Sequence, residues 1–315
     1  MNITPIISPE QRETFITMGF VHVEQAYPHD VALSAQQDVW KRVKEMGADP
    51  DDRTTWTKPM IHLTETYDTP AFRKCKTERL KQAVDELVGV GRWTTRETQD
   101  GWGWWPVNFG VGADADWTVS TNGWHWDGIH FQHSVDAPDQ GLLLLCFFSD
   151  IASHGGATLA AAGSHQIVAR FLASQKEPMQ LGTAIKSCIE QNLWLRDLTG
   201  MLDINDQSAW PRDFKKWHES GDRVERFMNR SYVDEAGTEL KVVETTGRAG
   251  DIYLCHPFLF HAAAPNTLRQ PRFMCNRTTP LDRRLDVRRE NPSPTLVEQA
   301  IINALYGSTP NRVAS

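Results

Sequence analysis

The middle of the chain breaks into short apolar runs, and this pattern limits the possible folds more than any other feature of the sequence. From Gly101 onward, glycine, aspartate, asparagine and proline separate the runs, as is typical of strands joined by turns. The runs read WWPVNF, DWTVSTNGWHWD, GLLLLCFFSD and ATLAAA, and strand-like segments return as ELKVVETT, DIYLCHPFLFHAA and PRFMCNRTT. Many short strands of this kind predict a barrel or jelly roll.

Helical patterns flank these strands. Ser8 and Gln11 have the spacing of a capping box, and Gly19 is placed to end the helix that they begin. Residues 31–46 and 70–88 carry apolar side chains at helical spacing, with charged residues between them. We interpret these segments as amphipathic helices that cover the strands.

The pattern predicts one domain over residues 1–315. We expect a helical part over about 1–100, a jelly-roll core over about 101–280 and a C-terminal helix over about 293–306. Residues 165–235 are polar and helical in pattern, but strands resume after them. We therefore interpret this block as an insertion within the core.

Composition excludes several classes of protein. The net charge of −7 argues against general binding to nucleic acid or to anionic membranes. The longest apolar run, residues 141–148, is far shorter than the roughly 20 residues that a spanning helix needs. The first residues lack the basic start and apolar stretch of a secretory signal, and the five cysteines show no CxxC spacing. We expect a cytoplasmic protein that acts on a small molecule; the sequence does not indicate its oligomeric state.

The segment STNGWHWDGIH carries the first candidate metal ligands. If it is a strand, His125 and Asp127 project from the same face, because side chains repeat every two residues. An imidazole and a carboxylate on one face supply two ligands of a 2-His-1-carboxylate site, which leaves coordination positions open.

The third ligand has two candidates, His256 and His261. We favour His261, because a hairpin with its turn near residues 266–267 places it opposite Arg272. A guanidinium beside a metal-binding histidine suits a dicarboxylate that chelates the metal with its other end. His256 lacks such a partner and precedes a proline, so we interpret it as structural.

Together these segments resemble the phytanoyl-CoA dioxygenase family of iron(II)- and 2-oxoglutarate-dependent oxygenases. The opening EQRETFITMGFVHV, the WHWDG segment, the glycine-rich GGATLAAAGSH and the closing GDIYLCHPFLFHAAAPNTLRQPRFMCN all look like segments of that family. The resemblance covers most of residues 8–280 and thins over 170–240. It implies a mainly β fold, a cupin-like double-stranded β-helix (jelly roll) core with flanking helices at both ends and a helical insertion.

The resemblance also implies roles for single residues. His125, Asp127 and His261 would bind Fe(II), and Arg272 would pair with the distal carboxylate of 2-oxoglutarate. Further residues that would bind this co-substrate are Asn108 and Thr158. The family often has serine or threonine two residues after the distal histidine, where this chain has Ala263. Arg272 and Thr158 would therefore contribute more to holding the co-substrate carboxylate.

Other residues near these motifs are candidates for substrate contact or for packing. Trp104, His130 and Phe131 are candidates for contact with the substrate. We expect Trp124 and Trp126 to pack away from the metal, because they alternate with its ligands. We expect a structural role for His165 and a surface position for His133.

The favoured function is oxidation of an organic molecule by an iron- and 2-oxoglutarate-dependent dioxygenase, a hydroxylase that consumes O2 and releases succinate and CO2. One alternative is a metal-dependent jelly-roll enzyme that does not use 2-oxoglutarate. The other is a binding or sensor protein that keeps the fold without catalysis.

Overall fold

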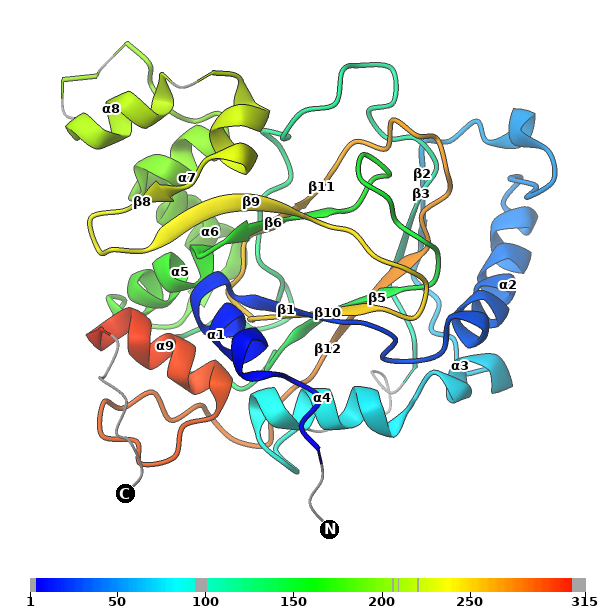
Figure 1. The fold of residues 1–315 in the computed structure, drawn as a ribbon, viewed down its shortest axis with the longest axis horizontal. Helices are drawn as coiled ribbons and strands as arrows, with labels where there is room; N and C mark the ends of the chain where they lie inside the picture. The colour runs from blue at the N-terminus through cyan, green and yellow to red at the C-terminus, as the bar shows by residue number, and fades with distance from the viewer. Residues whose placement is uncertain (1–3, 94–100, 206, 209, 220, 308–315) are drawn as a thin grey trace.

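Two four-stranded antiparallel sheets face each other at the centre of the molecule (Figure 1). The computed structural model describes residues 4–93, 101–205, 207–208, 210–219 and 221–307. One sheet has the strand order β1-β10-β5-β12, and the other has the order β11-β6-β9-β8. This arrangement is a jelly roll with flanking helices, so the predicted fold class is confirmed.

The strands are short, as the sequence predicts. The first sheet consists of β1 (Phe20–Val23), β10 (Ile252–Cys255), β5 (Leu143–Phe147) and β12 (Met274–Thr278). The second sheet consists of β11 (His261–Ala263), β6 (Thr158–Ala162), β9 (Glu239–Thr245) and β8 (Tyr232–Val233). Two smaller sheets pair β2 (Met60–Leu63) with β3 (Trp105–Asn108), and β4 (Gln132–His133) with β7 (Met179–Gln180).

The helices lie outside the sheets. They are α1 (Pro9–Met18), α2 (His29–Glu45), α3 (Pro70–Lys74), α4 (Glu78–Val88), α5 (Ser164–Ala173), α6 (Leu181–Glu190), α7 (Leu193–Leu198), α8 (Arg212–His218) and α9 (Leu296–Tyr306), with a 3₁₀ turn η1 (Arg53–Thr55) and a π-helical turn η3 (Glu225–Asn229). The elements from α5 to η3 lie between β6 and β9 in the chain, and Figure 1 shows α5 to α8 together at the left of the sheets. They form the predicted helical insertion.

Strand β5 explains why the core has two parts. Its residues Leu143, Leu145 and Phe147 belong to the cluster between the two sheets, whereas Leu144 and Cys146 belong to the cluster that includes the helices. Side chains alternate between the two faces of a strand, so a strand covered on both faces is apolar at every position. All five residues of β5 are buried.

The predicted helix boundaries are largely confirmed. Ser8 and Gln11 form both hydrogen bonds of a capping box on α1, and Gly19 ends this helix in the left-handed conformation at φ 85°. The long helix expected over residues 70–88 is wrong, because the chain forms α3 and α4 as separate helices. Thr77 causes the second start, since its hydroxyl accepts a hydrogen bond from the Leu80 amide.

The strand expected around WHWDG is also wrong. His125 forms a single antiparallel bridge with His261, and the residues on either side of His125 are not part of a ladder. The neighbouring Trp124 and Trp126 are buried in the core, as predicted.

Within the described part of the chain, no helix has the length and apolar character to cross a membrane.

Two buried histidines join the helices to the first sheet. The ring centroids of His165, on α5, and His256, just after β10, lie 4.9 Å apart. His165 donates from Nε2 to the Ile16 carbonyl of α1 at 3.1 Å, while the Phe258 amide donates to His256 Nδ1 at 3.2 Å. These contacts support the structural roles predicted for both residues. Burial lowers the pKa of His165 to about 4 and that of His256 well below its usual value.

This pair predicts that acid destabilises the fold. An unfolded histidine takes up a proton as the pH falls below about 6.5, but the folded protein keeps both rings neutral. Their contribution to the free energy of unfolding is therefore fully present above that pH and is lost as the pH falls towards 4. His165 alone accounts for a loss of about 2 kcal/mol between about pH 7 and about pH 5. Urea unfolding at the two pH values measures this loss. In His165→Asn the pH dependence becomes shallower by a similar amount, and an unchanged slope would contradict the assignment.

Candidate active site

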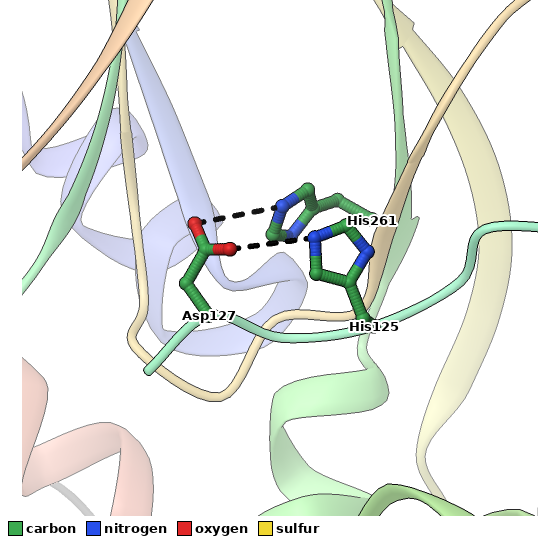
Figure 2. Close-up of side chains that lie close together, drawn as sticks. All are labelled: His125, Asp127 and His261. Atoms are coloured by element: carbon green, nitrogen blue, oxygen red, sulfur yellow. Dashed lines mark ion pairs between the residues drawn. The ribbon is translucent and has the colours of Figure 1, made fainter. Parts of the chain in front are cut away.

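Three ionisable side chains converge between the two sheets. His125, Asp127 and His261 each offer a ligand atom, and these atoms all lie within 4.8 Å of one another (Figure 2). His125 Nε2 lies 3.3 Å from Asp127 Oδ1, and His261 Nε2 lies 3.8 Å from Asp127 Oδ2. The structure therefore brings together the three residues that the sequence analysis selected as metal ligands.

Two backbone hydrogen bonds hold the histidines side by side. The His125 amide donates to the His261 carbonyl at 3.1 Å, and the His261 amide donates to the His125 carbonyl at 2.8 Å. Residues paired in this way have Cβ atoms about 4.5–5.5 Å apart on one face, and the two ring centroids are 4.4 Å apart. On its other side His261 pairs with Ala160 of β6, which ties the cluster to the second sheet.

Backbone carbonyls orient both imidazole rings. Nδ1 of His125 lies 2.7 Å from the Gly123 carbonyl oxygen, and Nδ1 of His261 lies 3.1 Å from the Leu259 carbonyl oxygen. A carbonyl only accepts hydrogen bonds, so each Nδ1 carries the proton and donates it. The lone pair of a neutral ring is then on Nε2, the nitrogen that faces Asp127, which is the tautomer that a metal ligand requires.

The charges in the cluster favour an ionised carboxylate. Burial opposes ionisation of Asp127, but the neighbouring imidazoles of His261 and His125 favour the ionised form more strongly, so the pKa of Asp127 lies below its usual value. Burial lowers the pKa of His261, which keeps this ring neutral near pH 7. The resulting donor set of two imidazoles and one carboxylate suits a divalent metal ion.

His133 supports the turn that follows Asp127. The sequence analysis placed this histidine at the surface, which is wrong, because it is 2% exposed. Its Nδ1 accepts a hydrogen bond from Trp126 Nε1 at 3.1 Å, and its Nε2 donates to the Gly128 carbonyl at 3.0 Å. Trp126 and Gly128 flank Asp127, so His133 fixes the chain on both sides of the carboxylate. No sequence motif indicates this role, because the two partners are an indole N–H and a backbone carbonyl.

Arg272 does not lie opposite His261, so the predicted hairpin is wrong. His261 begins β11 in one sheet, whereas Arg272 precedes β12 in the other. The chain between them crosses from one sheet to the other, as Figure 1 shows in orange, and does not return along the same sheet. Arg272 instead forms a backbone bridge with Asn108, at the end of β3.

The Arg272 guanidinium is buried without an acidic partner. It is 2% exposed, and Nη2 donates to the Pro106 carbonyl at 2.8 Å. Nε is buried and has no hydrogen-bond partner, and within the described chain no carboxylate forms an ion pair with this residue. Burial lowers its pKa to about 10, so the charge persists near pH 7. A buried charge of this kind is costly unless an anion joins it.

Asn108 is fully buried beside Arg272, and one end of its amide is free. Oδ1 accepts hydrogen bonds from the Gly110 and Val111 amides at 3.1 Å and 3.0 Å, whereas Nδ2 has no partner. Gly156 makes this position possible: a Cβ on it would lie 2.7 Å from Asn108 Nδ2, and its φ of 75° also disfavours other residues. In the sequence, only the glycine-rich stretch around Gly156 indicates that another residue packs closely against the backbone here.

Thr158 and Arg272 meet at one sulfur atom, that of Met274. Thr158 Oγ1 lies 3.7 Å from Met274 Sδ, and Arg272 Nη1 lies 3.8 Å from the same atom. The structure therefore brings together all three residues predicted to bind the co-substrate, Arg272, Asn108 and Thr158, at one end of the barrel. No sequence pattern predicts this role for Met274, because an isolated methionine in a strand carries no functional motif.

The candidate substrate contacts lie further apart. His130 is exposed and Phe131 half-buried after the Asp127 turn, where the Phe131 ring lies 4.6 Å from that of His133. Trp104 is 53% exposed, and its ring centroid lies 6.2 Å from that of His62 on β2. No interaction described for Trp104 connects it to the metal-ligand cluster. Contact of these three residues with substrate stays a prediction.

No family model matches the chain, and no curated protein matches it. Solved structures with a similar arrangement include HygX from Streptomyces hygroscopicus with nickel and 2-oxoglutarate bound, at 14% identity, 86% coverage of each chain and a TM-score of 0.42. EctD from S. alaskensis with 2-oxoglutarate and 5-hydroxyectoine has 14% identity and a TM-score of 0.45, over 88% of this chain and 77% of EctD. SnoK, a non-heme alpha-ketoglutarate-dependent carbocyclase from nogalamycin biosynthesis, has 14% identity and a TM-score of 0.43, over 89% of this chain and 87% of SnoK.

Because these identities and scores are low, we draw no functional conclusion from the likenesses. Membership of the phytanoyl-CoA dioxygenase family stays a prediction.

The cluster predicts one binding site for a divalent metal ion. Calorimetry with Co²⁺ or with anaerobic Fe²⁺ should give one ion per chain. Asp127→Ala should weaken binding by more than about 100-fold, since losing a residue that only orients a ligand already costs 10–100-fold. Asp116→Ala, at an exposed aspartate on the preceding segment, is the matched control and should bind as the wild type does. Equal affinity in the two variants would remove Asp127 from the site.

Proposed function

We propose that this protein is an Fe(II)- and 2-oxoglutarate-dependent dioxygenase. It hydroxylates, or otherwise oxidises, an unactivated C–H bond of a small or medium-sized organic molecule and releases succinate and CO2. The observation that carries this proposal is the buried Arg272, whose charge has no carboxylate partner within the described chain, in the same jelly roll as the His-Asp-His cluster.

The cluster fits iron. His125, Asp127 and His261 would hold the ion through two Nε2 atoms and a carboxylate oxygen, which leaves positions open for co-substrate and O2. When bound, the iron supplies the oxygen chemistry, and 2-oxoglutarate supplies two electrons as it is decarboxylated to succinate. The protein contributes ligand orientation, through the Gly123 and Leu259 carbonyls, and a buried setting.

Arg272 fits the far carboxylate of 2-oxoglutarate. A guanidinium presents parallel donors that match a carboxylate, and Arg272 Nε has no partner of its own. In β6, Ala160 pairs with His261, and Thr158, two residues earlier, contacts Met274 beside Arg272. Two residues along a strand span about 7 Å, a separation that a five-carbon diacid can bridge.

Thr158 stands beside the position where the family resemblance expects a hydroxyl. Ala263 occupies that position, and in the β11–β6 pairing it lies directly opposite Thr158. Cross-strand neighbours have Cβ atoms about 4.5–5.5 Å apart, so the Thr158 hydroxyl can take the place of the missing one. Ala160 and Ala162 also face the space between the sheets, and their small side chains leave room for a ligand.

Substrate would approach from the side of His125. The His125 side chain is 43% exposed and that of Asp127 is 27% exposed, whereas that of His261 is only 6% exposed. His130 and Phe131 follow Asp127 on this open side. We also propose that the chain forms one catalytic domain and acts in the cytoplasm; its five cysteines are all free and buried.

The proposal predicts a colour change and succinate release. Titration of the anaerobic Fe(II) protein with 2-oxoglutarate should produce a metal-to-ligand charge-transfer band, and addition of O2 should yield succinate. A protein that binds Fe(II) but shows neither the band nor succinate would be a metal-dependent jelly-roll enzyme of another type. A protein that shows the band but forms no succinate with O2 would support a binding or sensor role.

Arg272→Gln should separate the two ends of the site. The variant should keep the metal affinity of the wild type, because Arg272 does not contact the cluster. It should weaken 2-oxoglutarate binding by about 30-fold or more, since the pair is bidentate and hydrogen bonds to charged groups contribute about 1.5–3 kcal/mol each. Wild-type affinity for 2-oxoglutarate in this variant would contradict the assignment.

Thr158 offers a graded test. Thr158→Val removes the hydroxyl and should raise the KM for 2-oxoglutarate by about 3- to 10-fold, in line with a single hydrogen bond of about 1 kcal/mol. Thr158→Ser keeps the hydroxyl and is the matched control, with a KM near that of the wild type. If both variants have the same KM, the hydroxyl does not bind the co-substrate.

A further inference from the structure

The segment that leads to His125 lies outside both large sheets. Residues 117–124 form no helix and no strand, although the Val119 side chain is fully buried. Without a ladder, the carbonyls near this buried side chain must accept hydrogen bonds from other groups. Its position therefore depends on whatever groups donate hydrogen bonds to these carbonyls.

One side chain of the helical insertion donates to two of them. Arg223, just before η3, donates from Nε to the Val119 carbonyl at 2.8 Å and from Nη2 to the Ser120 carbonyl at 3.2 Å. The same guanidinium donates to the Asp197 carbonyl at 3.1 Å and to the Leu198 carbonyl at 2.6 Å. It thus connects the end of α7 to the segment before His125.

The geometry of this contact is well defined. Arg223 donates its hydrogen bonds to backbone carbonyls and forms no direct ion pair within the described part of the chain. Its guanidinium lies 4.8 Å from the centroid of the Phe227 ring. The carbonyls at the C-terminal end of α7 attract a positive charge. The planar fork of an arginine can reach four acceptors at once, which a lysine ammonium with three donors cannot do.

The connection continues from Ser120 to His125. The Ser120 carbonyl also accepts a hydrogen bond from Trp124 Nε1 at 2.8 Å, and Ser120 Oγ accepts one from the Asn122 amide at 3.0 Å. Gly123 then supplies the carbonyl that orients His125, at 2.7 Å from Nδ1. Arg223 thus bonds to Ser120, and Ser120 bonds to Asn122 and Trp124, the residues on either side of Gly123.

A second contact between the insertion and this segment lies beside the first. Gly200, just after α7, has a φ of 70°, and a Cβ on it would lie 3.2 Å from Thr121 Cγ2. The Thr121 side chain therefore packs closely against the Gly200 backbone. The insertion therefore holds the segment from one side at two adjacent points.

We propose that Arg223 is a positioning residue for the metal site: it holds residues 119–120 against α7 and thereby sets the place of His125. This inference rests on the proposed function, because it treats His125 as a metal ligand. The insertion then contributes to metal binding without supplying a ligand. His261 pairs with Ala160, and Arg272 forms its bridge with Asn108, and both of these partners lie outside the insertion.

Two measurements on the full chain test this role. Hydrogen exchange reports on the backbone of residues 119–125, and Co²⁺ calorimetry reports on the metal site. In Arg223→Met, amides in 119–125 should exchange about tenfold faster or more, whereas those of β6 and β10 should not change. Affinity for Co²⁺ should fall by about 10- to 100-fold. Arg223→Lys keeps the charge and some donors, and both effects should be smaller.

The matched control is Arg170→Met. Arg170 also lies in the insertion and bonds to Asp234 and Thr238, but it does not contact residues 117–125. Its loss should lower stability without changing exchange at 119–125 or affinity for Co²⁺. If Arg223→Met fails to fold, Arg223→Lys carries the comparison with this control.

Several outcomes would overturn the inference. Unchanged exchange at 119–125 in both Arg223 variants would show that Arg223 does not hold the segment. Faster exchange there with unchanged Co²⁺ affinity would show that the segment does not set the place of His125. If the wild type itself fails to bind Co²⁺, the proposed function is wrong, and the role of Arg223 at the metal site is wrong with it, whatever the exchange data show.

Discussion

Two backbone hydrogen bonds between His125 and His261 are the constraint on which the candidate site depends. The two residues are 136 positions apart in the chain, yet the bonds make their side chains immediate neighbours on one face. The immediate surroundings of each ligand are local. Asp127 follows two residues after His125, and the carbonyl that orients each ring lies two residues before that histidine. One pairing of distant backbone therefore completes a site whose parts are each encoded nearby.

At the other end of the barrel, the decisive feature is a charge that the fold does not neutralise. Arg272 is buried between Pro106 and Met274 with a free Nε, and Asn108 beside it has a free Nδ2. Two unsatisfied donors in one buried place are unusual, because native proteins bond nearly all such groups. Their cost is offset when an anion binds, which supports the proposal that Arg272 and Asn108 receive the co-substrate.

The sequence predicted which three side chains converge better than it predicted how the chain brings them together. His125 and Asp127 could be found from local spacing, and the jelly roll from the punctuation of short strands. The hairpin that placed His261 opposite Arg272 was wrong, because nothing local shows that β11 and β12 belong to different sheets. The contact of Arg272 with Asn108 depends on a long-range pairing of the same kind. His133 was misplaced because a histidine flanked by polar residues reads as a surface residue, whereas tertiary packing buries it.

The insertion between β6 and β9 is continuous in the chain, so it looks like a module that could be exchanged for another. The four carbonyls around Arg223 argue against a simple exchange. A module taken from another chain would have to fit the 117–124 loop that leads to His125. Loop and module would need to be transplanted together, so the two segments should also change together when such chains diverge.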